Sequence, residues 1–364
     1  MALALLESTD IPHGPLEALF TLDEEAGMGG ALGLDTDVLH GELLINIDTE
    51  DWGEFYLGCA GGVDVNVTRA YGVEPLPAGF AGQRITVKGL CGGHSGVNIH
   101  EERGSAIKLL IRILRGLEAQ FGLRLSGFSG GTARNALARE ANATVAVPVN
   151  AVESVRRELV RLESLFRQEL AGVDEGVVVE LAAEPVTEVI ALADQGLILA
   201  ALHAAPHGVK RMSRRVPGVV ETSNNMGVVR IADGQFSANF MVRSLLDSGT
   251  TQLADEITSL MSLIGATVER EGAYPGWAPN PGSALLELFQ QVYAEQYGQR
   301  AEVKVIHAGL ECGILGAKYP NMDMVSFGPN IRGAHAPGER VEVASVEKTW
   351  ELLKAVIARI PAAA

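Results

Sequence analysis

Apolar and polar positions along the chain alternate in short blocks, which predicts strands separated by turns and helices. An apolar run over residues 16–22 ends on three acids, Asp23, Glu24 and Glu25, and a glycine-rich turn follows. A second apolar run, over residues 43–48, ends on Asp48. Short apolar runs bounded by turn signals are typical of buried strands. The pattern predicts strands at 16–22, 43–48 and 55–59 and a helix near 26–33.

The chain divides into three zones by this pattern. Residues 1–65 and 271–364 both alternate strand and helix, and residues 66–270 form a longer α/β stretch. A Pro/Gly-rich segment at 272–283 marks the second boundary. We therefore expect a discontinuous α/β domain, residues 1–65 and 271–364, interrupted by an inserted domain, residues 66–270. An amphipathic helix is predicted over 345–360, where apolar residues recur at helical spacing.

The inserted zone shows a weak internal echo. Its two halves share an order of helices and strand pairs, and both contain Thr-x-x-Asn, at Thr132–Asn135 and at Thr222–Asn225. Each half resembles a β-α-β-β-α-β unit, which predicts an α+β domain of two ferredoxin-like halves. A chance match of so short a motif is the alternative.

Composition narrows the choice of partners. The chain has 364 residues, 47% of them hydrophobic, which suffices for at least two domains with cores of their own. Its formal net charge of −16 argues against nucleic acid or an anionic membrane as partner. Three widely separated cysteines favour a reducing compartment, the cytoplasm, and no apolar run approaches the roughly 18 residues of a membrane span.

The carboxylates behind the apolar runs are candidates for chemistry. In open α/β sheets, ligands gather at the carboxyl ends of the strands, where Glu24, Glu25 and Asp48 are predicted to lie. Adjacent residues of an extended segment point in opposite directions, so Glu24 and Glu25 can serve different roles, one toward a metal and the other toward a water. The alternative is that both acids favour the positive end of the following helix.

Three of the eight histidines occupy suggestive positions. His307 and His335 lie where a predicted strand gives way to a glycine-rich loop, and His94 lies between glycines on a turn. Histidine together with Glu and Asp is a common zinc ligand set. The residues alone leave open whether these histidines are ligands, structural groups or merely exposed.

Seven segments, in order over nearly the whole chain, resemble the aminoacyl-histidine dipeptidases, which are co-catalytic zinc metallopeptidases. These segments read TLDEEAGMGGALGL, INIDTEDWGEFYLGCAGGVD, GLCGGHSG, RSLLDSG, GAYPGW, IHAGLECGI and MDMVSFGPNIRGAHAPGE. The resemblance implies an α/β catalytic domain with an inserted lid domain. It also implies hydrolysis of Xaa-His dipeptides such as carnosine, with two divalent metal ions, zinc or alternatively manganese or cobalt.

The resemblance also implies roles in the metal site. Glu24 resembles the general base that activates a metal-bound water. Glu25 and His335 resemble ligands of one metal, and Asp48 resembles a ligand of the other. This assignment gives the two adjacent glutamates separate functions.

Further roles follow from the resemblance for the lid and the substrate site. His94 resembles the lid residue that stabilises the oxyanion. Asn135 and Arg243 resemble lid residues that hold the substrate, with Arg243 on its terminal carboxylate. His307 and Glu311 fall in a segment that lines the substrate site. The resemblance leaves the oligomeric state open and favours a homodimer.

The chain departs from the family pattern in its metal ligands. No histidine is followed two residues later by Asp, and no Asp-Asn-Gly occurs, although the family uses both. Glu25, Asp48 and His335 are therefore an incomplete ligand set, and we expect a truncated form with impaired or absent activity. The alternatives are a related aminoacylase or carboxypeptidase, or a non-catalytic remnant that acts only in binding or assembly.

Overall fold

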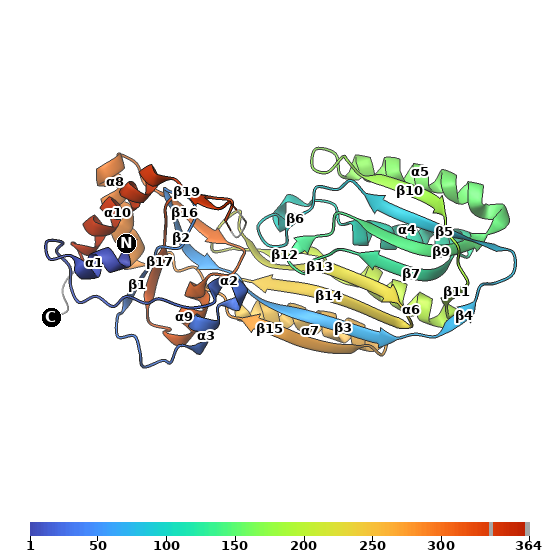
Figure 1. Cartoon of the computed structure of the whole chain (residues 1–364), viewed down its shortest axis with the longest axis horizontal. Coiled ribbons are helices and arrows are strands. Elements are labelled where there is room, and N and C mark those ends of the chain that lie inside the picture. The colour runs from blue at the N-terminus through green and yellow to red at the C-terminus, as the bar shows by residue number, and fades with distance from the viewer. Residues whose placement is uncertain (335–337, 361–364) are drawn as a thin grey trace. The chain divides into compact units, whose positions relative to one another are not determined.

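The computed structural model describes residues 1–334 and 338–360, except for the side chains of Glu25 and Ala26. It contains two compact units (Figure 1). The terminal unit comprises Met1–Gly61 and Tyr274–Ala364, and the central unit comprises Gly62–Ala273. The α/β fold class is confirmed. The boundary expected at 65/66 falls within β3 (Gly61–Ala70), nearly all of which belongs to the central unit.

A four-stranded sheet in the order β1-β17-β2-β16 forms the centre of the terminal unit. β1 is parallel to β17 and β16 is parallel to β2, whereas β17 and β2 are antiparallel. The carboxyl ends of β1 and β17 therefore meet at one edge of the sheet. The strands are β1 (Leu43–Asn46), β2 (Glu54–Cys59), β16 (Glu302–Ile306) and β17 (Asp323–Ser326).

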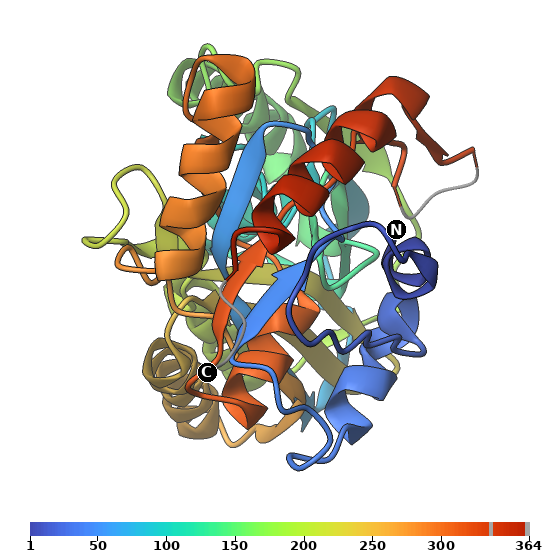
Figure 2. The same cartoon turned by 90° about the vertical axis from the view of Figure 1, so that its left-hand side faces the viewer.

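Helices pack on both faces of this sheet. Successive residues of β17 point to opposite faces: Val325 joins a cluster with α1, α8 and α10, and Met324 joins a cluster with α9. Figure 2 shows α8 (orange) and α10 (red) lying across the first of these faces. The predicted C-terminal helix is confirmed as α10. The helices are α1 (Ala2–Glu7), α8 (Ala284–Tyr297), α9 (Glu311–Lys318) and α10 (Val343–Ile357).

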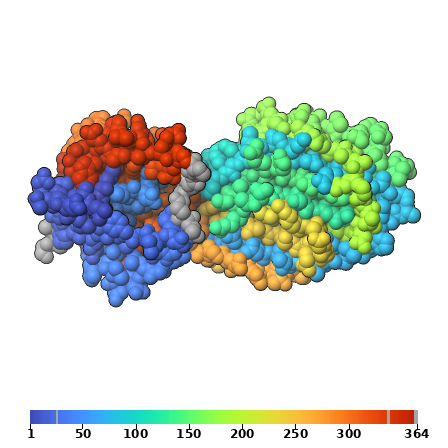
Figure 3. Space-filling view, in the orientation of Figure 1, coloured from blue at the N-terminus to red at the C-terminus, as the bar shows by residue number. Residues whose placement is uncertain are grey.

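The first predicted strand is wrong. Residues 16–22, all of which the structure describes, form no strand, and the side chains of Phe20 and Leu22 are 61% and 79% exposed. No described strand pairs with this run, so its backbone has no ladder to join. The N-terminal segment lies at the surface (dark blue in Figure 3). The single helix expected near 26–33 is two short helices, α2 (Glu24–Gly27) and α3 (Gly29–Gly33).

The central unit contains a nine-stranded sheet in the order β10-β5-β9-β7-β13-β14-β3-β15, with β12 paired to β13. Each half of this order places the first and third strands of a ferredoxin-like unit at its centre. The halves join through the antiparallel pair β7 and β13. Besides β3, the strands are β5 (Phe80–Lys88), β7 (Arg124–Gly130), β9 (Ala141–Pro148), β10 (Val178–Ala183), β12 (Gly208–Met212), β13 (Val220–Ala232), β14 (Gln235–Ser244) and β15 (Thr267–Tyr274).

One ferredoxin-like half is inserted into the other. The second half begins with β3 and resumes at α6, and the whole first half, from β5 to β10, lies between them. A short antiparallel pair, β4 (Val73–Pro75) and β11 (Glu188–Ile190), joins the two chain crossings. The helices α4 (Ala106–Phe121), α5 (Val152–Glu169), α6 (Leu192–Ala204) and α7 (Asp247–Leu263) share one hydrophobic cluster with the sheet.

The repeat of elements is confirmed, but the Thr-x-x-Asn motif does not mark equivalent places in it. Asn135 lies in the connection between β7 and β9, whereas Asn225 lies within β13. The short elements β6 (Gly93–His94), η1 (Ile99–Glu101), β8 (Ala136–Leu137) and η2 (Val149–Ala151) belong to the first half, and β18 (Ile331–Arg332) and β19 (Arg340–Val341) to the terminal unit. Among the described residues, no helix has the length and apolar character to span a bilayer.

Candidate active site

Asp48 lies two residues beyond β1, at the edge where β1 and β17 end together. The backbone N–H of Phe327 donates to the carbonyl of Asn46 at 3.0 Å, so the two loops continue side by side. A Cβ on Gly328 would lie 2.0 Å from the carbonyl oxygen of Thr49, so only glycine permits this approach. Asp48 is exposed while Thr49 is buried. The buried backbone thus holds the carboxylate outward.

Glu24 opens the four-residue helix α2, which turns the chain back on itself. Asp23 precedes it in the left-handed region, with φ of 66°. The N–H of Gly30 donates to the carbonyl of Leu22 at 2.8 Å, and a Cβ on Gly30 would lie 2.4 Å from the nitrogen of Leu22. Glu24 is half-buried. The side chain of Glu25 lies outside the described residues, so the opposed directions predicted for the two glutamates stay a prediction.

His307 and Glu311 lie beside the Glu24 turn. The hydroxyl of Thr21 donates to Oε2 of Glu311 at 3.0 Å, and a Cβ on Gly309 would lie 3.1 Å from the methyl of Met28. His307 is buried, and Glu311 begins α9. Oε1 of Glu311 is buried with no hydrogen-bond partner among the described atoms. A carboxylate oxygen in that state suits a cation or a proton donor from a ligand.

Asp48 and Glu311 share a neighbour in Cys312. Burial raises the pKa of the Cys312 thiol, and the carboxylates of Glu311 and Asp48 add to that rise. The structure therefore brings the Glu24 turn together with the segment 307–311, and Asp48 lies in the same unit.

The described residues do not complete a metal site. No group of three His, Cys, Asp or Glu among them is placed to hold an ion. Of the three predicted ligands, only the side chain of Asp48 is described, because His335 and the side chain of Glu25 lie outside the described residues. The donor types of all three, two carboxylates and an imidazole, match those that zinc accepts.

His94 ends β6, and its own loop fixes its ring. Nδ1 accepts hydrogen bonds from the N–H groups of Gly96 and Val97 at 3.2 and 3.0 Å. The neutral ring therefore carries its proton on Nε2. Oδ1 of Asn98 accepts from the N–H of His94 at 2.9 Å, and its Nδ2 donates to Glu101 at 2.7 Å. The arrangement presents Nε2–H as a hydrogen-bond donor, which oxyanion stabilisation requires.

Asn135 and Arg243 are the other two candidates of the central unit. Asn135 is exposed, and its carbonyl accepts from the N–H of Ser95 at 2.8 Å, next to His94. Arg243 is buried on β14 and pairs in register with Ser223 of β13. The bond from Ser95 links the loops of His94 and Asn135, whereas β6 and β14 belong to separate sheets of the same unit. Glu24, Asp48, His307 and Glu311 belong to the terminal unit, and His94, Asn135 and Arg243 belong to the central unit.

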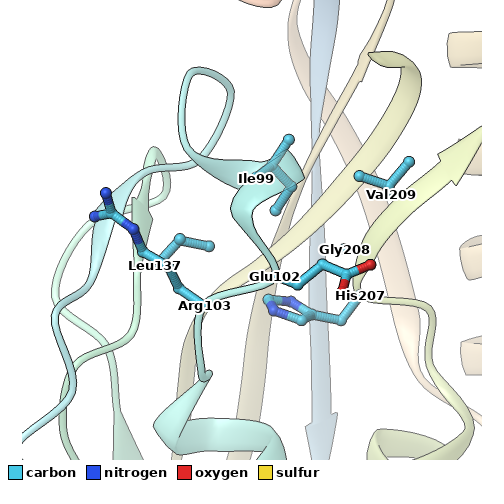
Figure 4. Close-up of a pocket in the computed structure, with 7 residues that line it drawn as sticks. All are labelled: Ile99, Glu102, Arg103, Leu137, His207, Gly208 and Val209. Atoms are coloured by element: carbon cyan, nitrogen blue, oxygen red, sulfur yellow. The ribbon is translucent and has the colours of Figure 1, made fainter. Parts of the chain in front are cut away.

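The central unit contains a pocket of about 270 Å³ between η1 and β12 (Figure 4), which the sequence pattern did not predict. Ile99, Leu137 and Val209 give it apolar walls, and Glu102 and His207 add polar groups. Its one signal in the sequence is His207, which follows the end of α6 by three residues. None of the predicted site residues whose side chains the structure describes lines this pocket.

His207 is held neutral in that pocket. Its Nδ1 accepts from the N–H of Met226 at 3.2 Å. Burial lowers the pKa of His207 to about 4, and the charge of Lys108 contributes to that shift. The ammonium of Lys108 donates to the carbonyls of Leu202, His203 and Ala205 at the end of α6, and burial lowers its own pKa to about 8.

Two matches to known proteins identify the family of this chain. A model of the M20 peptidase dimerisation domain matches residues 85–174, most of the first ferredoxin-like half. The cytosol non-specific dipeptidase of Escherichia coli (strain K12) is 42% identical over 362 residues, which cover 99% of this chain and 75% of that protein. The chain belongs to this family of dipeptidases. It is therefore an enzyme of the peptide-hydrolase class.

A solved member of the family has the same fold. The aminoacylhistidine dipeptidase of Vibrio alginolyticus superposes with a TM-score of 0.94 at 44% identity, covering 100% of this chain and 74% of that one. The predicted family is thus confirmed. The chain spans about three quarters of the length of both relatives.

Proposed function

We propose that this dipeptidase hydrolyses Xaa-His dipeptides with the help of divalent metal ions, zinc or alternatively manganese or cobalt. The name of the Vibrio relative, an aminoacylhistidine dipeptidase, supports the substrate class. The observation that carries the proposal is that hydrogen bonds join the loop of Asn135 to that of His94, in a unit that also contains the buried guanidinium of Arg243. Such a set suits a short peptide with a free carboxylate.

We propose that Glu25, Asp48 and His335 hold the metal. When bound, a divalent ion would supply an activated water at neutral pH and a positive charge near the scissile carbonyl. The edge formed by β1 and β17 supports this location, because Asp48 extends from it. The orphaned Oε1 of Glu311 supports a cation-rich or donor-rich neighbourhood.

The chain's own residues have separate tasks in the proposed reaction. Glu24 takes a proton from the attacking water and delivers it to the leaving amine. His94 donates from Nε2 to the oxygen that becomes negative as the carbonyl is attacked. Arg243 pairs with the terminal carboxylate of the dipeptide, and Asn135 orients the peptide group. His307 and Glu311 line the substrate site.

The test is hydrolysis by purified residues 1–364, with free histidine as the product measured. Three proposed ligands are few for two ions, since a catalytic zinc uses about three protein ligands. We expect the dialysed protein to retain less than one zinc per chain and to be inactive, and added zinc, manganese or cobalt to restore turnover. Two zinc ions retained per chain after dialysis would contradict the weak metal binding that we expect.

Competing substrates separate the proposal from its alternatives. We expect L-carnosine and other Xaa-His dipeptides to be cleaved in preference to N-acetylated amino acids and longer peptides. Preference for acetylated substrates would favour an aminoacylase, and release of single C-terminal residues from long peptides would favour a carboxypeptidase. Absence of all cleavage at saturating metal would favour the binding remnant.

We also propose a homodimer located in the cytoplasm. The dimerisation-domain match over residues 85–174 supports the assembly, and the cytosolic name of the Escherichia coli relative supports the compartment. Sedimentation at micromolar concentration tests the assembly. A single species with the mass of one chain would contradict it.

A further inference from the structure

Asn225 is a fully buried residue of β13 that none of the proposed catalytic roles uses. Its side-chain Nδ2 donates to the carbonyl oxygens of Arg134 and Ala136, at 2.9 Å each. These carbonyls flank Asn135 on both sides. The Arg134 carbonyl belongs to the peptide plane before Asn135, and the Ala136 carbonyl belongs to the plane after Ala136, so one amide group holds the backbone on both sides of the pair Asn135–Ala136.

The chemistry of this contact requires the two N–H groups. The opposite amide orientation would set Oδ1 against two carbonyl oxygens, so the arrangement is unambiguous. Oδ1 itself is buried and has no hydrogen-bond partner among the described atoms. An apolar residue would fill this space without an orphaned oxygen. The donors are what asparagine contributes here.

The same support extends from Asn135 to His94. The carbonyl of Asn135 accepts from the N–H of Ser95 at 2.8 Å, and β6 and β8 pair His94 with Ala136. A shift of the 134–136 backbone would therefore shift His94 with it.

β13 also contacts this loop backbone to backbone. A Cβ on Gly227 would lie 2.7 Å from the carbonyl oxygen of Arg134, and one on Gly131 would lie 1.8 Å from that of Gly227. Two residues before Asn225, Ser223 pairs with Arg243 on β14. The segment 223–227 therefore supports Asn135, His94 and Arg243 together.

We infer that Asn225 is a positioning residue that keeps Asn135 and His94 in register with Arg243. The inference rests on the proposed function for the roles of those three residues. According to this inference, Asn225 sets the spacing of Asn135, His94 and Arg243 without touching the substrate itself.

The first test separates hydrogen bonding from packing. Asn225→Asp keeps the size and removes both donors, and Asn225→Ala serves as the second variant. Asn224→Asp is the matched control, because Asn224 is equally buried on the same strand and donates instead to the carbonyl of Pro206 at 2.7 Å. Thermal unfolding monitors the stability of all three.

Amide hydrogen exchange is the first readout, and it needs no activity. We expect the N–H of Ser95 to exchange about tenfold faster in both Asn225 variants, with the segment 131–138, and to be unchanged in Asn224→Asp at matched stability. Unchanged exchange of Ser95 in the Asn225 variants would overturn the inference. So would equal acceleration in the control.

A double-mutant cycle at saturating metal is the second readout. We expect Asn225→Asp to lower kcat/KM for an Xaa-His dipeptide by about tenfold or more, and to add little to the loss in Asn135→Ala. Fully additive losses would show that Asn225 acts independently of Asn135. If the parent protein shows no turnover, the proposed function fails, and hydrogen exchange still decides whether Asn225 holds the loop.

Discussion

The two units support their candidate residues in different ways. In the terminal unit, Glu24 and Asp48 extend from short turns behind apolar runs, and Glu24 belongs to a helix of only four residues. In the central unit, His94 and Arg243 lie on paired strands, and Asn135 lies in a loop held from both sides. The first group depends on local turns, and the second depends on strand pairs and on hydrogen bonds from β13 to the loop of Asn135.

This difference predicts how each group responds to substitution. A side chain on a short turn contributes less to folding than one buried in a sheet, so we expect its replacement to change mainly the chemistry. A side chain buried in a sheet contributes to both, so its replacement lowers stability as well as activity. The predictions below test this contrast, beginning with the largest effect.

Glu24→Gln removes the proposed general base while keeping shape. We expect turnover at saturating metal to fall by about 100- to 10,000-fold, because a positioned acid–base group contributes in that range. Metal content and thermal midpoint should match those of the parent. Near-normal kcat would refute the general-base role, and a large loss of stability would break the contrast between the units.

Arg243→Ala removes the proposed carboxylate partner. We expect kcat/KM for a dipeptide to fall by about 10- to 100-fold, since hydrogen bonds to charged groups contribute about 1.5–3 kcal/mol. The thermal midpoint should fall too, because Arg243 is buried. A substrate whose terminal carboxylate is replaced by an amide is the control, and it should lose much less between parent and variant.

Gly328→Ala tests a packed loop of the terminal unit, the one behind Asp48. The new methyl group would overlap the carbonyl of Thr49, and we expect unfolding to become easier by about 1–3 kcal/mol. Gly33→Ala is the matched control, since no atom lies within 4 Å of its added Cβ. Equal stability of the two variants in denaturant titrations would show that the close approach of Gly328 to Thr49 does not support the Asp48 loop.

His207→Asn tests how the stability of the central unit depends on pH. We expect its effect on stability to be the smallest of these effects. The folded-state pKa of about 4 lies below the usual value of 6.5, so between these values the unfolded chain binds a proton that the folded chain does not. Stability therefore falls as pH decreases from about 6.5 to about 4. We expect Asn, which can still accept from Met226, to make this dependence shallower by less than one proton in chemical denaturation. An unchanged slope would contradict it.

Much of the fold follows from the sequence pattern, since local periodicity reports which face of an element is buried. Helix α10 and strand β1 appear where predicted, and the repeated order of elements in the central zone corresponds to two ferredoxin-like halves. The order of the motifs identified the family, which the relatives confirm. The roles of Glu24, Asp48 and the other site residues stay predictions.

Strand pairing and side-chain contacts over long separations were decided only by the tertiary structure. The apolar runs at 16–22 and 43–48 look alike in sequence, yet only the second finds a neighbouring strand, β17. One ferredoxin-like half lies inside the other because β3 pairs with β14 and β15, which come much later in the chain. Asn225 reaches Arg134 across 91 residues. Periodicity records the environment of a residue, whereas its partners depend on how distant segments meet.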